Sequence, residues 1–124
     1  MLPKNKRLRN SADFAAVYKQ GKYVVSRQLV LYYRKNTGTA EIRVGFVASK
    51  KLGASTVRNR CKRLLREAVR RLLPEIKPGY DLVLVSRPPL KTERFQNIVA
   101  TLARLLRKAG LMENKNEETS CLEH

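Results

Sequence analysis

Apolar residues recur at helical spacing near the start of the chain, where Phe14, Val17 and Tyr18 fall at positions i, i+3 and i+4. The three side chains would share one face of a helix, which this pattern predicts over residues 11–19. Gly21 suits the end of that helix, because glycine tolerates the backbone conformations in which helices stop.

The next apolar segments favour β-strands. A short β-prone piece at 23–26 precedes strands at 29–35 and 42–49, and turn residues at 36–38 separate those two strands. The strand at 42–49 alternates, so its side chains divide between two faces. One face carries Ile42, Val44, Phe46 and Ala48, and the other carries Arg43, Gly45, Val47 and Ser49.

A longer helix follows, with Ser55 or Thr56 as its N-cap. Its apolar side chains form one stripe at helical spacing: Val57, Cys61, Leu64, Leu65, Ala68, Val69, Leu72 and Leu73. Residues 81–86 are apolar on both faces, which predicts a buried strand. Because a helix joins it to the strand at 42–49, we expect the two strands to run parallel. A last amphipathic helix is expected over 91–109.

The composition fits one folded domain with a separate tail. The chain has 124 residues, of which 43% are hydrophobic, and this length suffices for one core but not for two. We expect a single domain over residues 1–110. Residues 111–124 contain four Glu and one Lys, a composition that predicts an acidic, disordered tail. Its last three residues, Leu122-Glu123-His124, are typical of the start of a purification tag.

Positive charge is concentrated on the long helix. The chain carries a net charge of +17 with a pI of about 10.6, and between residues 58 and 71 seven Lys or Arg residues accompany one acid, Glu67. So much like charge opposes folding, whereas a polyanion would convert it into binding energy. We therefore interpret the helix as a phosphate-binding surface of a nucleic-acid-binding domain, rather than as an ordinary solvated face. Asn59 either contacts a base edge or is merely tolerated in the first turn, and its spacing does not decide between these.

The aromatic residues Phe14, Tyr18 and Tyr32 also have two interpretations. Their spacing alone favours packing in the core. Exposed aromatic rings on a basic sheet are, however, a common device for binding single-stranded RNA, and tyrosine can pack and contact a ligand at once.

Catalytic and metal-binding patterns are absent from the sequence. His124 is the single histidine, the carboxylates of the body are scattered, and no glycine-rich phosphate loop occurs. Cys61 and Cys121 have no CxxC spacing, which argues against a zinc site or a disulfide scaffold and suits a reducing cytosol. No run of eighteen apolar residues predicts a membrane span. We expect a cytoplasmic protein without catalytic residues or an organic cofactor.

Residues 43–71 have the sequence RVGFVASKKLGASTVRNRCKRLLREAVRR. This long segment resembles the sequence signature of the bacterial ribonuclease P protein subunit. Residues 7–22 and 27–33 resemble that family's first helix and second strand. The whole resemblance spans about residues 5–108. It implies an α/β (α+β) sandwich with a mostly antiparallel four-stranded sheet and about three helices. The strand–helix–strand crossover of that family is left-handed, whereas the general rule favours a right-handed one.

The resemblance also implies a function. A protein of this family binds the catalytic RNA subunit and the single-stranded 5′ leader of precursor tRNA, while the RNA, with Mg²⁺, removes the leader; no further protein partner and no membrane are expected. By position, the RNA-subunit contacts would be Arg58, Asn59, Arg60, Lys62, Arg63 and Arg66. The leader contacts would be Phe14, Tyr18, Tyr32, Ser49 and Lys50. Tyr18 departs from the Phe that is common in the family, and a tyrosine ring should still stack.

Three other interpretations remain at this point. A structural RNA-binding protein of ribosomal type would have a similar composition, and precursor-tRNA processing would distinguish it. A duplex-DNA regulator could use residues 55–73 as a recognition helix, but β-strands occupy the places where its partner helix should lie. A membrane-surface helix is disfavoured because the leucine-rich stripe is needed to cover the sheet.

Overall fold

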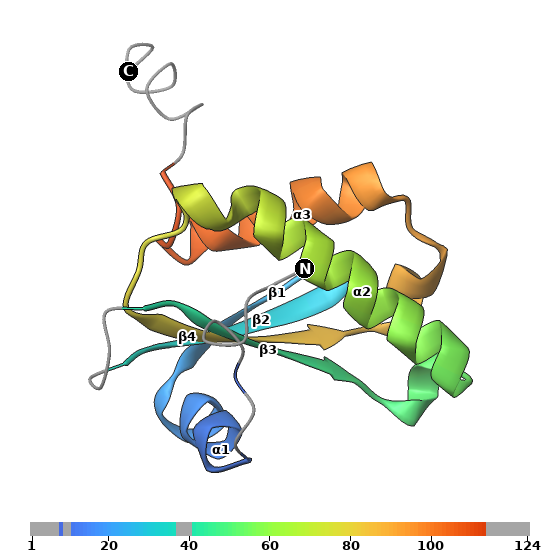
Figure 1. Cartoon of the computed structure of the whole chain (residues 1–124), viewed down its shortest axis with the longest axis horizontal. Coiled ribbons are helices and arrows are strands. Elements are labelled where there is room, and N and C mark those ends of the chain that lie inside the picture. The colour runs from blue at the N-terminus through green and yellow to red at the C-terminus, as the bar shows by residue number, and fades with distance from the viewer. Residues whose placement is uncertain (1–7, 9–10, 37–40, 114–124) are drawn as a thin grey trace.

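The computed structural model describes residues 8, 11–36 and 41–113, which form three α-helices and a four-stranded sheet (Figure 1). The α-helices are α1 (Ser11–Gln20), α2 (Ser55–Leu72) and α3 (Phe95–Lys108). The strands are β1 (Lys22–Val25), β2 (Leu29–Lys35), β3 (Arg43–Ala48) and β4 (Tyr80–Ser86). Short 3-10 helices are η2 (Lys50–Leu52), η3 (Leu73–Glu75) and η4 (Pro88–Thr92).

The strands are arranged in the order β1-β2-β4-β3. β2 pairs antiparallel with both β1 and β4, whereas β3 pairs parallel with β4. The parallel pair, joined through α2, confirms the expectation drawn from the connecting helix. The left-handed crossover stays a prediction.

Two helices cover one face of the sheet and one covers the other. α2 and α3 pack together on the first face, and α1 lies alone on the opposite face, where it contacts β2 and β4 (Figure 1). This three-layer arrangement confirms the predicted α/β sandwich, and among the helices of the described residues α1 alone lies on its face of the sheet.

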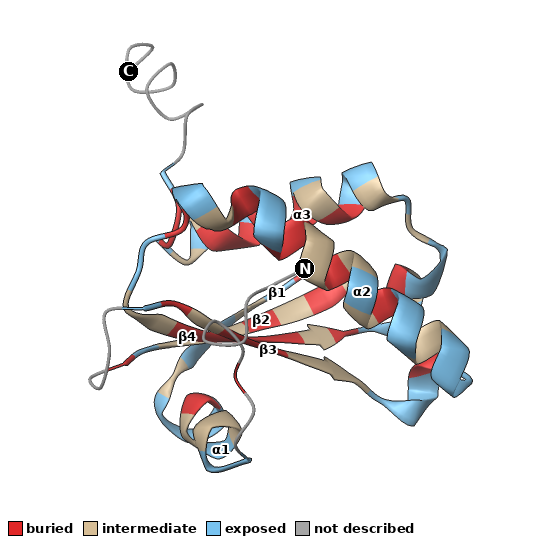
Figure 2. Ribbon diagram, in the orientation of Figure 1, coloured by how far each residue is buried: buried red, intermediate tan, exposed pale blue. Residues whose placement is uncertain are grey.

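Each face of the sheet has its own core. The larger core joins the sheet to α2 and α3, whose inner sides are buried and outer sides exposed (Figure 2). The predicted alternation in β3 is confirmed, because Val44 and Phe46 belong to this larger core while Val47 faces α1. The smaller core beneath α1 contains Leu8, Val17 and Val83, with Phe14, Tyr32, Val47 and Val85 packed against it.

Two predicted helix starts are wrong. The N-cap of α2 is Ala54, not Ser55 or Thr56, and no side chain caps this helix. Buried Leu52 anchors the preceding 3-10 turn. The Arg58 N–H donates to the Ala54 carbonyl at 3.0 Å, so the first hydrogen-bonded turn of the helix begins at Ala54, earlier than expected. The last helix begins at Phe95 rather than at residue 91, because the proline-containing segment η4 forms 3-10 turns first.

The ordered domain also extends past the predicted boundary at residue 110. Leu111 and Met112 are buried, and the Lys77 N–H donates to the Leu111 carbonyl at 2.8 Å. Met112 forms an isolated antiparallel bridge with Ile76. Residues 114–124 of the predicted tail, and 37–38 of the predicted turn, lie outside the described residues. No helix in the described part of the chain is long and apolar enough to cross a membrane.

Candidate nucleic-acid interface

The outer surface of α2 carries the basic residues that the sequence singled out. The side of the helix that faces the sheet and α3 is buried and consists of Cys61, Leu65, Ala68, Val69 and Leu72. The six predicted contact residues occupy the remaining surface. Asn59, Arg60 and Arg63 are exposed, and Arg58, Lys62 and Arg66 are half-buried.

Neighbouring elements hold two of these arginines in place. The Arg66 guanidinium lies 5.6 Å from the centre of the Phe46 ring on β3, a cation–π distance. The Arg60 guanidinium donates a hydrogen bond to the carbonyl oxygen of Lys91 in η4. Because these side chains are already positioned, less conformational entropy is lost when they bind a phosphate.

The centre of the surface is a shallow groove of about 450 Å³ lined by Asn59, Arg63, Arg66 and Glu67. Glu67 accepts hydrogen bonds from Arg70 Nε at 2.8 Å and Nη2 at 2.5 Å. The hydrogen bonds from Arg70 lower the pKa of the Glu67 carboxyl below its usual value, so Glu67 is ionised at neutral pH. The groove is therefore cationic, with one carboxylate at its side.

On the opposite side of the sheet, α1 and β2 bring together the three predicted aromatic residues. Tyr18 and Tyr32 meet edge to face, with ring centres 4.8 Å apart and an interplanar angle of 88°. Burial raises the pKa of the Tyr18 hydroxyl, and the neighbouring Tyr32 raises it further, so the Tyr18 hydroxyl is neutral at physiological pH. Tyr18 is nevertheless 42% exposed, so part of its ring remains open to a ligand.

Phe14 lies deeper than the two tyrosines. Its half-buried ring packs on the backbone of Gly45 in β3, so closely that a Cβ at Gly45 would lie 2.4 Å from the Phe14 Cζ atom. Glycine at this position therefore allows α1 to approach the sheet. Much of the Phe14 ring is therefore covered by packing against the sheet. Its predicted contact with a leader stays a prediction.

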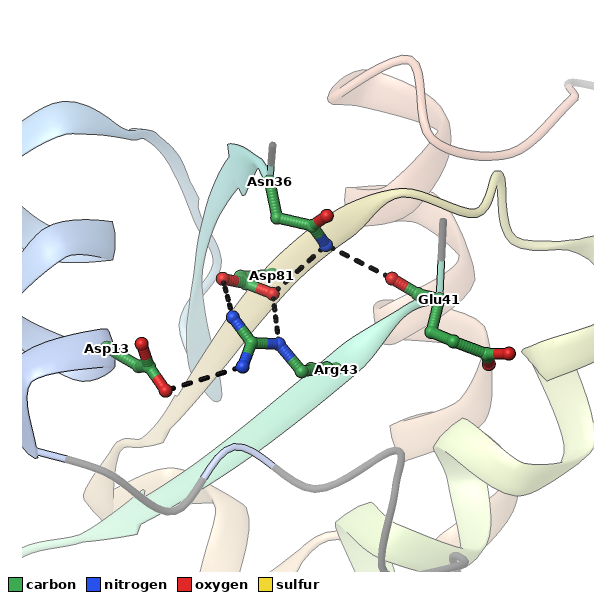
Figure 3. A network of polar contacts seen from close by, with 5 residues as sticks. All are labelled: Asp13, Asn36, Glu41, Arg43 and Asp81. Atoms are coloured by element: carbon green, nitrogen blue, oxygen red, sulfur yellow. Dashed lines mark hydrogen bonds and ion pairs between the residues drawn. The ribbon is translucent and has the colours of Figure 1, made fainter. Parts of the chain in front are cut away.

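A polar network fixes the first turn of α1 to the sheet (Figure 3). Arg43 binds the buried Asp81 carboxylate through two hydrogen bonds, of 2.9 Å from Nε and 2.8 Å from Nη2. Its third nitrogen, Nη1, lies 3.4 Å from the carboxylate of Asp13 on α1. The hydrogen bonds from Arg43 raise the pKa of its guanidinium, and Asn36 donates to the same Asp81 carboxylate at 3.2 Å. The network therefore sets the position of the helix that carries Tyr18.

Ser49 and Lys50 lie exposed just beyond the end of β3, and their predicted contact with the leader stays a prediction. In the sheet, β4 lies between β2 and β3, and Val85 of β4 pairs with Val47 of the neighbouring strand β3. These half-buried valines belong to the layer beneath α1, and they were not among the site residues predicted from the sequence. The alternation of β3 indicated the face of Val47, but the pairing that aligns it with Val85 cannot be read from local sequence.

Tyr23 was not among the site residues predicted from the sequence. It lies on β1 directly opposite Tyr32, and the two ring centres are 5.6 Å apart. The β-prone character of residues 23–26 predicted a strand there, and this strand is β1. Nothing in the sequence indicated which strand would lie beside it.

Comparisons with known proteins decide between the remaining interpretations. A family model described as Ribonuclease P matches residues 2–110. A ribonuclease P protein component from Oceanobacillus iheyensis is 37% identical over 119 residues, which cover 96% of this chain and 98% of the relative. The chain belongs to the ribonuclease P protein family.

Solved structures of the ribonuclease P protein family have the same fold. The RNase P protein of Staphylococcus aureus is 32% identical and matches with a TM-score of 0.80, covering 87% of this chain and 98% of that one. The RNase P protein of Thermotoga maritima is 34% identical, with a TM-score of 0.76 and the same two coverages, 87% and 98%.

Membership in the ribonuclease P protein family settles the broad function. The chain is a subunit of the endoribonuclease that processes the 5′ end of tRNA, and membership implies partnership with the ribonuclease P RNA. The ribosomal-type alternative is not favoured, because family model, relatives and solved structures agree. The roles of the individual residues on α2 and beside α1 remain predictions.

Proposed function

We propose that α2 binds the ribonuclease P RNA while the aromatic surface beside α1 holds the single-stranded 5′ leader of precursor tRNA. The observation that carries this proposal is the separation of two chemically different surfaces by one sheet. α2 and α1 lie on opposite faces of the sheet (Figure 1). The cationic residues belong to α2, and Tyr18 of α1 meets Tyr32 on the face that α1 covers. A subunit of this shape can bind a structured RNA and a flexible strand at the same time.

The chemistry of α2 suits a folded RNA. Arginine binds phosphate oxygens in a bidentate manner, and the four arginines among the predicted residues follow the backbone of an RNA without reading its sequence. Because no side chain caps the first turn of α2, its backbone N–H groups are available to a further phosphate.

The chemistry of the opposite surface suits a single strand. Bases of a leader are unpaired, so their faces can stack on Tyr18 and Tyr32, and stacking tolerates most sequences. We assign the hydrolysis to the RNA component, which would hold most of the Mg²⁺. This chain would position the substrate, and we expect it to do so in the cytoplasm.

The test is cleavage of a precursor tRNA at low Mg²⁺ concentration by the protein alone, the RNA alone and the two together. We expect efficient removal of the leader by the mixture, and no turnover by protein from which all RNA has been removed. Turnover by the RNA-free protein, or a mixture no more active than the RNA, would contradict the proposal.

A further inference from the structure

The aromatic surface continues past Tyr32 onto the edge strand β1. Tyr23 contacts the Tyr32 ring at 5.6 Å with an interplanar angle of 38°. Among the described residues it is the most exposed large hydrophobic side chain, at 63%, and Val25 on the same face of β1 is 45% exposed. Tyr18, Tyr32 and Tyr23 thus form a continuous aromatic surface across α1, β2 and β1.

Folding accounts for only part of this arrangement. A cross-strand aromatic pair stabilises a sheet by roughly 0.2–1 kcal/mol, which explains the contact between Tyr23 and Tyr32. It does not explain the open face of Tyr23. Tyr33, which follows Tyr32 on β2, shows how a tyrosine of this sheet is covered when it serves packing alone. It points to the other face of the sheet and packs against the larger core.

The ring spacing limits how a base could bind. A base inserted between two aromatic rings needs about 7 Å between them, since stacked carbon atoms approach to about 3.5 Å. The rings of Tyr23 and Tyr32 are closer than that, at 5.6 Å. The open position for a base is therefore the exposed side of the Tyr23 ring, beyond Tyr18 and Tyr32.

We propose that Tyr23 is an additional stacking site for the single-stranded leader, so that the protein holds at least one leader base more than Tyr18 and Tyr32 can hold together. This inference rests on the proposed leader surface and extends it to β1. The net charge of +17 and the continuity with Tyr32 favour a polyanionic strand over an apolar protein partner. Strength of stacking, rather than hydrogen bonding to base edges, would govern recognition at this position.

The test measures the affinity of the reconstituted holoenzyme for precursor tRNAs whose leaders increase one nucleotide at a time. In the Tyr23→Thr variant, a β-branched residue preserves the strand but removes the ring. We expect this variant to bind short-leader substrates normally and to lose roughly tenfold in affinity once the leader is long enough to reach β1. Tyr23→Phe keeps the stacking face and should bind like the unchanged protein.

Lys22→Ala is the matched control, because Lys22 is the preceding exposed residue of β1 and its side chain points to the opposite face. Lys22→Ala should change the affinity by the same factor for all leader lengths. Normal binding of every substrate by a folded Tyr23→Thr variant would overturn the assignment of Tyr23, and so would an equal loss for leader-bearing and mature tRNA. A concentration-dependent dimer that Tyr23→Thr abolishes, with leader affinity unchanged, would instead assign β1 to contact with a second copy of the chain.

The same series separates this inference from the proposed function. If Tyr32→Ala weakens binding of leader-bearing substrates and Tyr23→Thr does not, the leader surface stands and ends at Tyr32. If the unchanged holoenzyme binds mature tRNA and every precursor equally, the leader surface itself is wrong, and the inference fails with it.

Discussion

The outer face of α2 and the aromatic surface beside α1 are built in opposite ways. All six predicted residues of the first surface come from one helix, within nine positions from Arg58 to Arg66. The second surface needs α1, β1 and β2 to meet, and it depends on close packing beneath α1. Charge acts over a Debye length of about 10 Å and tolerates small displacements, whereas stacking requires contact. Substitutions should therefore affect the two surfaces differently.

The largest effect should follow from removing the charge of α2. Replacing Arg58, Arg60, Arg63 and Arg66 together by Ala should weaken binding of the ribonuclease P RNA about a thousandfold at 0.1 M salt. The log–log salt dependence should flatten by roughly one unit for each arginine. Alanine is the best helix former, so the helix should persist, and circular dichroism can verify this. Titrations at several salt concentrations measure both quantities.

The control for this variant is leader binding. Once the holoenzyme is assembled at high concentration, the variant with four Arg→Ala substitutions should still prefer leader-bearing to mature tRNA, because its aromatic surface is intact. An unchanged salt dependence would show that the arginines form an ordinary solvated face.

A smaller effect, on the other surface, should follow from Gly45→Ala. The new methyl group would lie 2.4 Å from Phe14 Cζ and 2.6 Å from Cε1, so the Phe14 ring must shift, and we expect α1, which carries it, to be displaced as well. Overpacking of this kind costs about 1–3 kcal/mol of stability, measurable by denaturant unfolding. Leader binding should also weaken, since α1 carries Tyr18, while RNA-subunit binding should not change.

A second substitution tests this mechanism. Phe14→Leu shortens the clashing side chain, so the double variant should lose less stability than the sum of the two single losses. Strict additivity would show that Gly45 does not act through Phe14.

Tyr32→Ala should weaken binding of leader-bearing precursor tRNA by about tenfold, because it removes the ring that joins Tyr18 to Tyr23. Affinity for mature tRNA, which has no leader, should hardly change. A thermal melt must show that the variant stays folded, since Tyr32 also packs against the core beneath α1. A folded variant that lost affinity equally for both tRNA forms would place the leader elsewhere.

The same contrast explains how much could be predicted from the sequence. The basic surface follows from helical periodicity alone, because the buried stripe with Cys61 and Leu65 leaves the arginines on the remaining sides. Strand β2 was predicted with its observed bounds, since a run of β-branched, aromatic and apolar residues lies between turn signals. The parallel pairing of β3 and β4 followed from the helix between them.

The remaining features depend on contacts between distant parts of the chain. The register that places Tyr23 opposite Tyr32 is a property of two strands together, and neither sequence specifies it alone. The role of Gly45 became visible only with Phe14 packed on it. The burial of Met112 likewise depends on its bridge with Ile76, whereas the local composition indicated a solvated tail.

The smallest effect should come from Glu67, the one carboxylate that lines the groove on α2. Glu67→Gln removes a negative charge beside Arg63 and releases Arg70, so RNA-subunit affinity should rise about twofold to threefold, within the range of exposed charge pairs.

The hydrogen bonds from Arg70 lower the pKa of Glu67 in the folded protein. The carboxylate therefore persists above the ordinary pKa of Glu and is lost as the pH falls through the lowered value. The difference in RNA-subunit affinity between Glu67→Gln and the unchanged protein should accordingly be constant from about pH 6 to 8. It should vanish below the lowered pKa, where both side chains are neutral. Glu75→Gln, which removes the same charge in η3 beyond the end of α2, should have a weaker effect. Equal gains from the two substitutions would mean that net charge, rather than the groove, determines the affinity.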